Sequence, residues 1–150
     1  CNSRKIIIAP GGGFPEKCWG NQNFTELTKL LQNNLGNSIS IIGSAEDRNR
    51  IKIKNCKRVL NLCGKLNLRQ SAAMVSNSEL VITNSSLAMH LAGAFRVPSI
   101  TVLGDWYDSA SLHHQQWGYD EGVVCGREEK EGIYNSCKPQ NVYQIFQRFQ

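Results

Sequence analysis

Strand-sized apolar runs alternate with segments of helical periodicity along residues 5–104, and this alternation limits the folds open to the chain. The runs that read as strands are residues 5–9, 38–42, 59–62, 79–83 and 98–103. Helical or helix-like segments separate them, at residues 24–35, 46–54, 68–75 and 87–95. Such alternation predicts parallel strands joined by crossover helices, hence a Rossmann-like, doubly wound α/β sheet with its ligand site at the carboxyl ends of the strands.

Local signals also predict where individual helices begin and end. Asn23 is an expected N-cap, and Gly36 is the expected C-terminal stop of the same helix. Asn67 and Gln70 have the spacing of a capping box and predict the start of another helix. Pro139 favours the first turn of a last helix, whose apolar face should pack back against the domain.

The 150 residues are expected to form a single domain with three segments. We predict a core at residues 5–104, a long ordered loop at 105–137 and a C-terminal helix at 138–150. The loop prediction rests on a polar stretch dotted with aromatic residues, in which no clear periodicity is visible.

Composition excludes several classes of protein. Hydrophobic residues make up 41% and charged residues 19% of the chain, which argues against disorder and low complexity. The longest apolar runs are strand-sized, so no transmembrane segment is expected and the chain should be soluble or at most peripheral. The net charge of +5 is spread along the chain rather than gathered in a Lys/Arg block, and we therefore expect a solvated basic face and no nucleic-acid partner.

The six cysteines are scattered, without a C-x-x-C pair or a histidine at zinc-module spacing, so no metal site is expected. This usage fits a reducing cytoplasm better than a secreted disulfide scaffold. Cys125 and Cys137 flank one predicted loop, and we expect them to pair only if they are exposed to an oxidant.

Two segments that follow predicted strands contain candidate phosphate and ribose contacts. The glycines of residues 10–13 free backbone N–H groups for an anion, although a tight turn explains them equally well. Lys17 lies four residues beyond Gly13, where its ammonium is either solvated or within reach of a phosphate held by the loop. Glu46 follows the second strand, where a carboxylate suits ribose hydroxyls or simply the first turn of a helix.

The segment of residues 83–90 is the most distinctive local feature. Its polar side chains, followed by the free N–H groups of a helix start, make a pyrophosphate cradle, and Ser85 or Ser86 also serves as an ordinary N-cap. His90 lies about one turn into this helix, and the residues alone favour a satisfied core histidine over a ligand contact. A serine hydrolase is disfavoured because the chain has no G-x-S-x-G elbow.

In their order, these motifs resemble the C-terminal domain of glycosyltransferase family 9, the ADP-heptose:lipopolysaccharide heptosyltransferases. After the Pro-Gly-Gly-Gly loop comes Lys-Cys-Trp at residues 17–19, similar to the family's Lys-x-Trp. Residues 41–46 read Ile-Ile-Gly-Ser-Ala-Glu and residues 61–66 read Asn-Leu-Cys-Gly-Lys-Leu. Residues 84–92 are similar to the family's Asn-Asp-Ser-Gly-x-x-His-Leu-Ala, and the resemblance covers most of residues 5–104.

The resemblance implies the donor-binding half of a GT-B enzyme that moves a heptose or related sugar from an ADP-sugar to a lipopolysaccharide-type acceptor. Phosphate contacts would come from Gly12, Gly13 and Lys17, with Lys17 stabilising the leaving group. Glu46 would meet the ribose and Leu66 the adenine through its backbone. The diphosphate and sugar end would be completed by Ser86, Leu87 and His90, and Ser85 is the donor-binding residue at the position of the family's sugar-contacting aspartate.

The resemblance also sets expectations about what lies outside this chain. The general base would belong to an acceptor-binding domain expected to precede this segment, so no catalytic residue is assigned and the fragment alone is expected to be inactive. The ADP-sugar is a substrate, and no cofactor or metal is expected. The acceptor implies a cytoplasmic location, at the inner face of the membrane, with peripheral membrane contact.

One departure from the family pattern leaves the sugar open. The family's Asp-Ser-Gly reads Ser85-Ser86-Leu87 in this chain, and the aspartate is a sugar-hydroxyl contact in the family pattern. Two alternatives therefore stand beside an active heptosyltransferase half: a non-catalytic nucleotide-sugar-binding module, and a GT-B protein that uses UDP-sugars.

Overall fold

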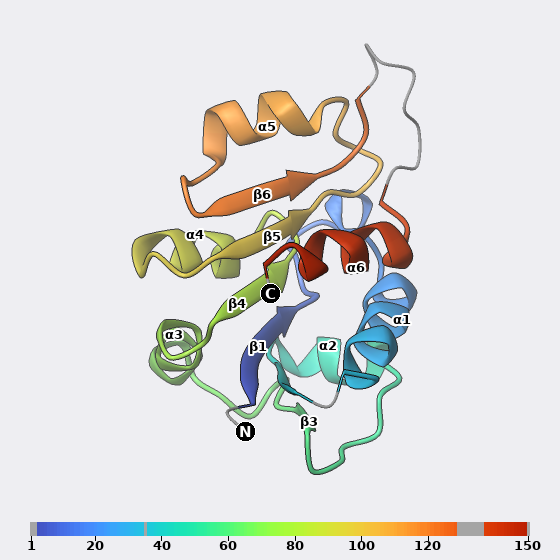
Figure 1. Ribbon diagram of the computed structural model, residues 1–150, viewed down its shortest axis with the longest axis vertical. Helices are drawn as coiled ribbons and strands as arrows, with labels where there is room; N and C mark the ends of the chain where they lie inside the picture. Colours follow the sequence, from blue (N-terminus) through green and yellow to red (C-terminus); the bar gives the residue numbers. More distant parts are fainter. Residues whose placement is uncertain (1–2, 35, 129–136, 150) are drawn as a thin grey trace.

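The computed structural model describes residues 3–34, 36–128 and 137–149, and these form one α/β unit (Figure 1). The strands are β1 (Arg4–Ala9), β2 (Asn37–Ile41), β3 (Val59–Asn61), β4 (Leu80–Thr83), β5 (Ser99–Val102) and β6 (Gly122–Cys125). The helices are α1 (Asn21–Gln32), α2 (Ala45–Arg50), α3 (Leu68–Ser76), α4 (Leu87–Ala94), α5 (Ala110–Trp117) and α6 (Pro139–Gln147), with a short 3-10 helix, η1, at Pro15–Lys17.

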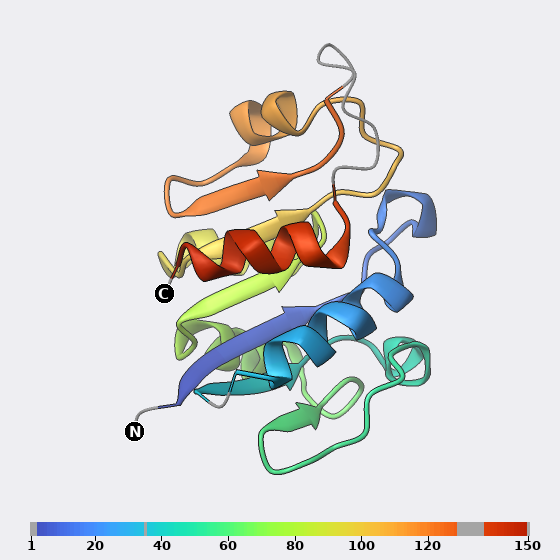
Figure 2. The same ribbon diagram turned by 45° about the vertical axis from the view of Figure 1, so that its right-hand side comes forward.

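The six strands form one sheet in the order β3-β2-β1-β4-β5-β6, and every adjacent pair is parallel (Figure 2). This confirms the prediction of a Rossmann-like, doubly wound sheet. The chain builds outward from β1 to one edge and then returns to build β4, β5 and β6 on the other side. The order therefore reverses between β1 and β4, and ligands of such sheets bind at the carboxyl ends of the strands beside that reversal.

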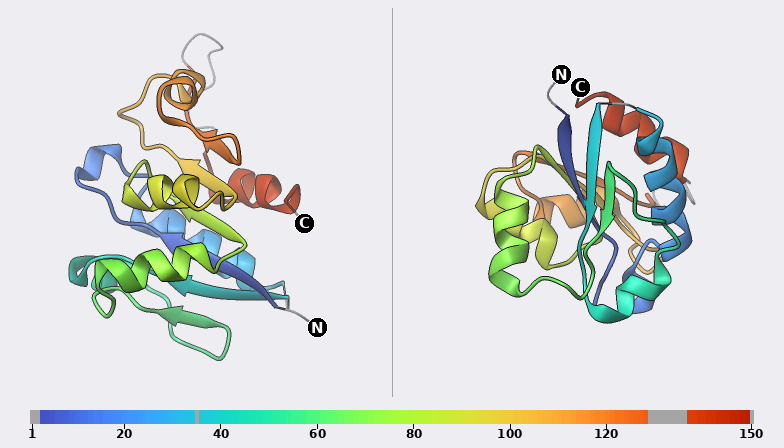
Figure 3. Two further views of the ribbon diagram at one scale, coloured as in Figure 1. Left: turned by 90° about the vertical axis from the view of Figure 1, so that its left-hand side faces the viewer. Right: turned by 90° about the horizontal axis from the view of Figure 1, so that it is seen from below.

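Helices cover both faces of the sheet, as the end-on view in Figure 3 shows, with α1 and α6 on one side and α3 and α4 on the other. The isoleucine run of β1 serves both cores because successive side chains of a strand point to opposite faces. Ile6 and Ile8 join the core beneath α1 and α6, whereas Ile7 and Ala9 join the core beneath α3 and α4. A strand buried on both faces explains the uninterrupted apolar run in the sequence.

The ends of α1 differ from the prediction. The N-cap is Gly20, with a φ of 103°, and Asn23 lies inside the first turn, where its Nδ2 donates to the carbonyl of Trp19 at 2.7 Å. The helix ends at the C-cap Asn33, before Gly36. Leu35, which the apolar spacing assigned to this helix, lies outside the described residues.

The predicted long loop at residues 105–137 is the largest error, because α5 and β6 lie within it. The helix begins at the N-cap Ser109, whose hydroxyl accepts from the Leu112 N–H at 3.1 Å. The strand is four residues long and, within the described residues, pairs only with β5, so it needs little apolar sequence and gives a weak signal. Residues 129–136 of the predicted loop lie outside the described part of the chain.

The other elements lie close to their predicted positions. The capping box of Asn67 and Gln70 is present at the start of α3, and α6 begins at Pro139 and buries Val142 and Phe146. Among the described residues, no helix has both the length and the apolar character needed to cross a membrane.

Candidate functional site

Two cavities open at the carboxyl ends of the strands. The first, which we call the glycine-loop cavity, has a volume of about 490 Å³ and lies between the loops that follow β1, β2 and β4. It gathers six of the predicted site residues: Gly12, Gly13, Glu46, Leu66, Ser86 and Leu87. The second, the aromatic cavity, has a volume of about 800 Å³ and gathers the other three, Lys17, Ser85 and His90. The neighbours Ser85 and Ser86 line different cavities, so both spaces border the segment that follows β4.

The side chain of Asn84 fixes the glycine loop against the end of β4. It is fully buried, and its Nδ2 donates to the Pro10 carbonyl at 2.6 Å and to the Gly11 carbonyl at 3.3 Å. Its Oδ1 accepts from the Trp19 N–H at 2.9 Å. One amide therefore joins β4 to both ends of the segment that contains the glycines and Lys17, and the sequence analysis did not single it out.

Asp47 forms the buried wall of the glycine-loop cavity beside this loop. Its carboxylate accepts from both the N–H and the hydroxyl of Ser44 at 2.8 Å, and the Ser44 hydroxyl accepts from the Asp47 N–H in return. A Cβ at Gly11 would lie 2.5 Å from an Asp47 carboxylate oxygen, so only glycine permits this close approach. The Ser-x-x-Asp spacing is a capping box that sequence inspection could have found.

Glu46 lines the same cavity and has a solvent-exposed ion-pair partner. Its side chain is 80% exposed and pairs with Arg50 at 3.4 Å, one turn further along α2. An exposed pair of this kind contributes little to stability, so the Glu46 carboxylate is free to exchange Arg50 for a ligand hydroxyl.

The opposite side of the glycine-loop cavity combines apolar side chains with an open helix start. Leu66 is partly buried, whereas Leu87 is 55% exposed and offers its side chain to the cavity. Ser86 is the N-cap of α4, as predicted, but its hydroxyl lies 3.1 Å from that of Thr83 and caps no N–H group of the helix. No side chain of the described residues caps the first-turn N–H groups of α4, so these groups suit an anionic ligand.

In the aromatic cavity the Lys17 ammonium lies within cation–π distance of two aromatic rings. Its Nζ lies 4.1 Å from the centroid of the Trp106 ring and 5.1 Å from that of Phe14. Cation–π contacts of this kind hold an ammonium in place without neutralising it. The backbone carbonyl of Lys17 also accepts from the Gly104 N–H at 3.2 Å, which ties its loop to the end of β5.

His90 is oriented by a residue from the segment that was predicted to be a loop. Its Nδ1 lies 2.8 Å from the Tyr119 hydroxyl, and the two rings meet edge to face. Tyr119 packs on Gly93 of α4, where a Cβ would lie 2.3 Å from the tyrosine ring. The half-buried imidazole lines the aromatic cavity, so the prediction of a core histidine from the residues alone is wrong and the ligand-facing alternative fits.

Replacement of Gly93 by alanine tests the packing of Tyr119 on α4, because the direction of the change in the free energy of unfolding depends on it. Alanine normally stabilises a helix interior relative to glycine by about 1 kcal/mol. At Gly93 the new methyl would overlap the Tyr119 ring, so we expect the free energy of unfolding to fall by about 1–3 kcal/mol in urea titrations. A Gly13→Ala control, whose Cβ meets no atom within 4 Å, should leave stability nearly unchanged, and a more stable Gly93→Ala chain would refute the packing.

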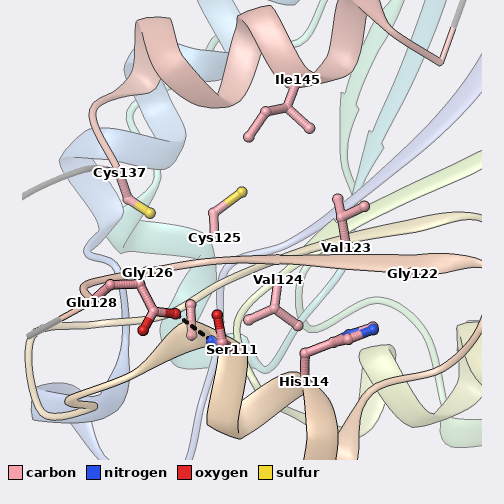
Figure 4. A pocket seen from close by; sticks show the side chains of 11 residues that line it. Ser111, His114, Gly122, Val123, Val124, Cys125, Gly126, Glu128, Cys137 and Ile145 are labelled. Carbon is pink, nitrogen blue, oxygen red and sulfur yellow. Dashed lines mark hydrogen bonds between the residues drawn. The ribbon is translucent and has the colours of Figure 1, made fainter. Parts of the chain in front are cut away.

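A third cavity of about 520 Å³ lies away from these residues, between α5, β6 and α6 (Figure 4). Cys125 and Cys137 both line it. The hydrogen bond with Cys137 and burial raise the pKa of the Cys125 thiol far above its ordinary range. Thiol exchange proceeds through the thiolate, so pairing of these two cysteines under oxidant stays a prediction and is expected to be slow.

The structure thus adds residues that sequence reasoning missed at the site: Asn84, Asp47, Trp106, Tyr119 and His113. In the described ranges, no group of three or more His, Cys, Asp or Glu side chains is arranged to hold a metal ion.

Comparison with known proteins agrees with this architecture. The model of glycosyltransferase family 9 (heptosyltransferase) matches residues 1–135. The chain belongs to this family. Lipooligosaccharide heptosyltransferase 2 of Haemophilus influenzae is 32% identical over 110 residues, which is 67% of this chain and 32% of that protein. Lipopolysaccharide heptosyltransferase 2 of Salmonella typhimurium is 30% identical over 107 residues, which is 66% of this chain and 30% of that protein.

Solved heptosyltransferases share the fold. The structure of E. coli ADP-heptose LPS heptosyltransferase II superposes with a TM-score of 0.80 at 24% identity, covering 99% of this chain and 46% of the other. The E. coli heptosyltransferase WaaC with ADP superposes with a TM-score of 0.78 at 19% identity, covering 99% and 45%. The chain therefore spans about a third of the length of the curated relatives and just under half of the solved structures.

Proposed function

We propose that this chain is the donor-binding domain of a glycosyltransferase that transfers a heptose or related sugar from an ADP-sugar to a lipopolysaccharide-type acceptor. The observation that carries the proposal is the convergence of all nine predicted donor contacts on two adjoining cavities at the reversal of strand order. These residues come from loops that are far apart in sequence, and a packing role alone gives no reason for them to meet at open space.

The two cavities suit the two ends of an ADP-sugar. Leu66 and Leu87 offer apolar surface to a purine, and Glu46 lies where it can accept from ribose hydroxyls. The glycine loop and the open start of α4 offer N–H groups to the diphosphate, with Lys17 as its counter-charge and leaving-group stabiliser. The sugar then extends into the aromatic cavity. Solved relatives carry ADP and ADP-2-deoxy-2-fluoro heptose, which supports this choice of donor.

The remaining parts of the reaction lie outside these residues. Transfer also needs a general base at the acceptor hydroxyl, and we propose that an acceptor-binding domain supplies it, so this segment alone should not turn over. We further propose that the intact protein works in the cytoplasm at the inner face of the membrane, where a lipopolysaccharide precursor is within reach.

Titration calorimetry with ADP, ADP-heptose and UDP tests the donor assignment. We expect ADP and ADP-heptose to bind and UDP to bind at least tenfold more weakly, because the adenine contacts are lost. Preference for UDP would instead favour a GT-B protein that uses UDP-sugars. Absence of binding by all three nucleotides would overturn the proposal.

Replacement of Glu46 by alanine tests the ribose contact. We expect an ADP affinity about three- to tenfold lower, since the lost hydrogen bond is made by a solvent-exposed carboxylate that water also reaches, and little change in stability because the Arg50 pair is exposed. The matched control is Glu26→Ala, which removes a carboxylate from α1, away from both cavities. Equal ADP affinities of the two variants would argue against a role for Glu46.

A further inference from the structure

One buried histidine that lines the aromatic cavity is not among the nine predicted donor contacts. His113 comes from α5 and is 5% exposed, and its Nε2 lies 2.8 Å from the Ser85 hydroxyl. Its ring meets that of Tyr107 edge to face, with centroids 5.1 Å apart, and Tyr107 meets Trp106 in the same way. Aromatic packing therefore fixes the ring while one nitrogen reaches the end of β4.

The environment of His113 decides where its proton lies. Burial, aided by the neighbouring His114 and His90, lowers the pKa of the imidazole, so the ring is neutral near neutral pH and has a single N–H. Nδ1 is buried and has no hydrogen-bond partner among the described residues. A proton on Nδ1 would be a buried, unpaired donor, whereas a proton on Nε2 has the Ser85 oxygen as acceptor.

This tautomer sets the direction of the serine hydroxyl. Because Nε2–H already donates to Oγ, the hydrogen of Ser85 is left for another acceptor. Both residues line the aromatic cavity, whose exposed indoles at Trp106 and Trp117 offer the apolar faces on which sugar rings pack.

We propose that His113 is a positioning residue. It takes no part in the chemistry but holds the Ser85 hydroxyl so that the hydroxyl hydrogen points at an oxygen of the donor sugar, and the two residues together determine which sugar binds. The inference rests on the proposed function, since it requires that the sugar of the donor enter the aromatic cavity. It adds a specificity device that is built from α5, an element absent from the sequence prediction.

Calorimetry with ADP and with ADP-heptose separates this role from a structural one. Ser85→Ala should lower the affinity for ADP-heptose about tenfold and leave that for ADP unchanged, because only the sugar contact is lost. His113→Leu should give the same sugar-specific loss, and the double variant should lose no more than either single one, since the two act as a unit. His113→Gln, whose amide places a donor near Nε2, should retain affinity within about threefold of the parent chain.

The control is His114→Gln. His114 is on the same helix but is exposed and lines the third cavity, so the affinities for ADP and for ADP-heptose should both be unchanged. Should the leucine variant fail to fold, His113→Gln and His113→Asn give the same comparison, because the shorter amide falls short of Ser85.

Losses that add in the double variant, or that affect ADP as strongly as ADP-heptose, would overturn the inference and leave the proposed function standing. The inference would also be overturned if the parent chain bound ADP-heptose no more tightly than ADP. A parent chain that binds neither nucleotide would overturn the proposed function itself, and the inference with it.

Discussion

An Asn84→Ala chain is expected to be about 3 kcal/mol less stable than the parent and to bind ADP at least tenfold more weakly. Asn84 is fully buried and joins β4 to the carbonyls of Pro10 and Gly11 and to the N–H of Trp19. Truncation removes the partner of two buried groups and of the partly buried Gly11 carbonyl, and a buried group left unpaired costs roughly 1–3 kcal/mol unless water replaces the amide. Affinity should fall with stability because the freed loop is the one that presents Gly12, Gly13 and Lys17.

Urea unfolding gives the first quantity and titration calorimetry with ADP the second. Asn77→Ala is the matched control, because Asn77 is an exposed C-cap residue of α3 whose side chain donates to Ala73 and Ser76 of the same helix. It should cost less than about 1 kcal/mol and leave ADP affinity unchanged. If the Asn84 and Asn77 variants unfold at the same urea concentration, Asn84 does not hold the loop.

Lys17→Ala should have the opposite profile, with a large effect on binding and a small one on folding. An ammonium bonded to a phosphate contributes about 1.5–3 kcal/mol, so ADP affinity should fall roughly ten- to a hundredfold. Loss of the contacts with Trp106 and Phe14 should change stability by less than about 1 kcal/mol, since Phe14 and Trp106 are both more than half exposed.

Calorimetry at two salt concentrations checks this, because the Lys17 contribution should shrink as salt rises. Lys29→Ala removes a charge from the last turn of α1 and serves as the control for net charge. A similar loss of ADP affinity in both lysine variants would show that general charge, rather than a contact by Lys17, accounts for the effect.

The parts of the fold that could be predicted are those whose signal is local. The Ile6-Ile7-Ile8 run gave β1 because a strand buried on both faces needs uninterrupted apolar sequence. The Asn67 and Gln70 spacing gave the start of α3 because a capping box closes within four residues. The doubly wound parallel sheet then followed from alternation, and with it the expectation of a ligand site at the carboxyl ends of the strands.

The parts of the fold and of the candidate site that could not be predicted depend on contacts between residues that are distant in the sequence. Asn84 meets Pro10 across 74 positions, and His113 meets Ser85 across 28, so neither role is visible in a sequence window. The edge strand β6 and the polar helix α5 gain their order from β5 and from each other rather than from their own patterns. The candidate site residues were predicted from motif order, whereas the side chains that contact them could be identified only in the structure.

Amide chemical-shift mapping during titration of the chain with ADP tests the central claim most directly, because it reports where the nucleotide binds. We predict that saturable shifts gather at the glycine loop, at Ser44 to Glu46, at Leu66 and in the first turn of α4, which together line the glycine-loop cavity. The strand β6 and the neighbouring Ile145, which line the third cavity, should not respond. Shifts confined to that third cavity, or no saturable shifts at all, would contradict a donor site at the reversal between β1 and β4.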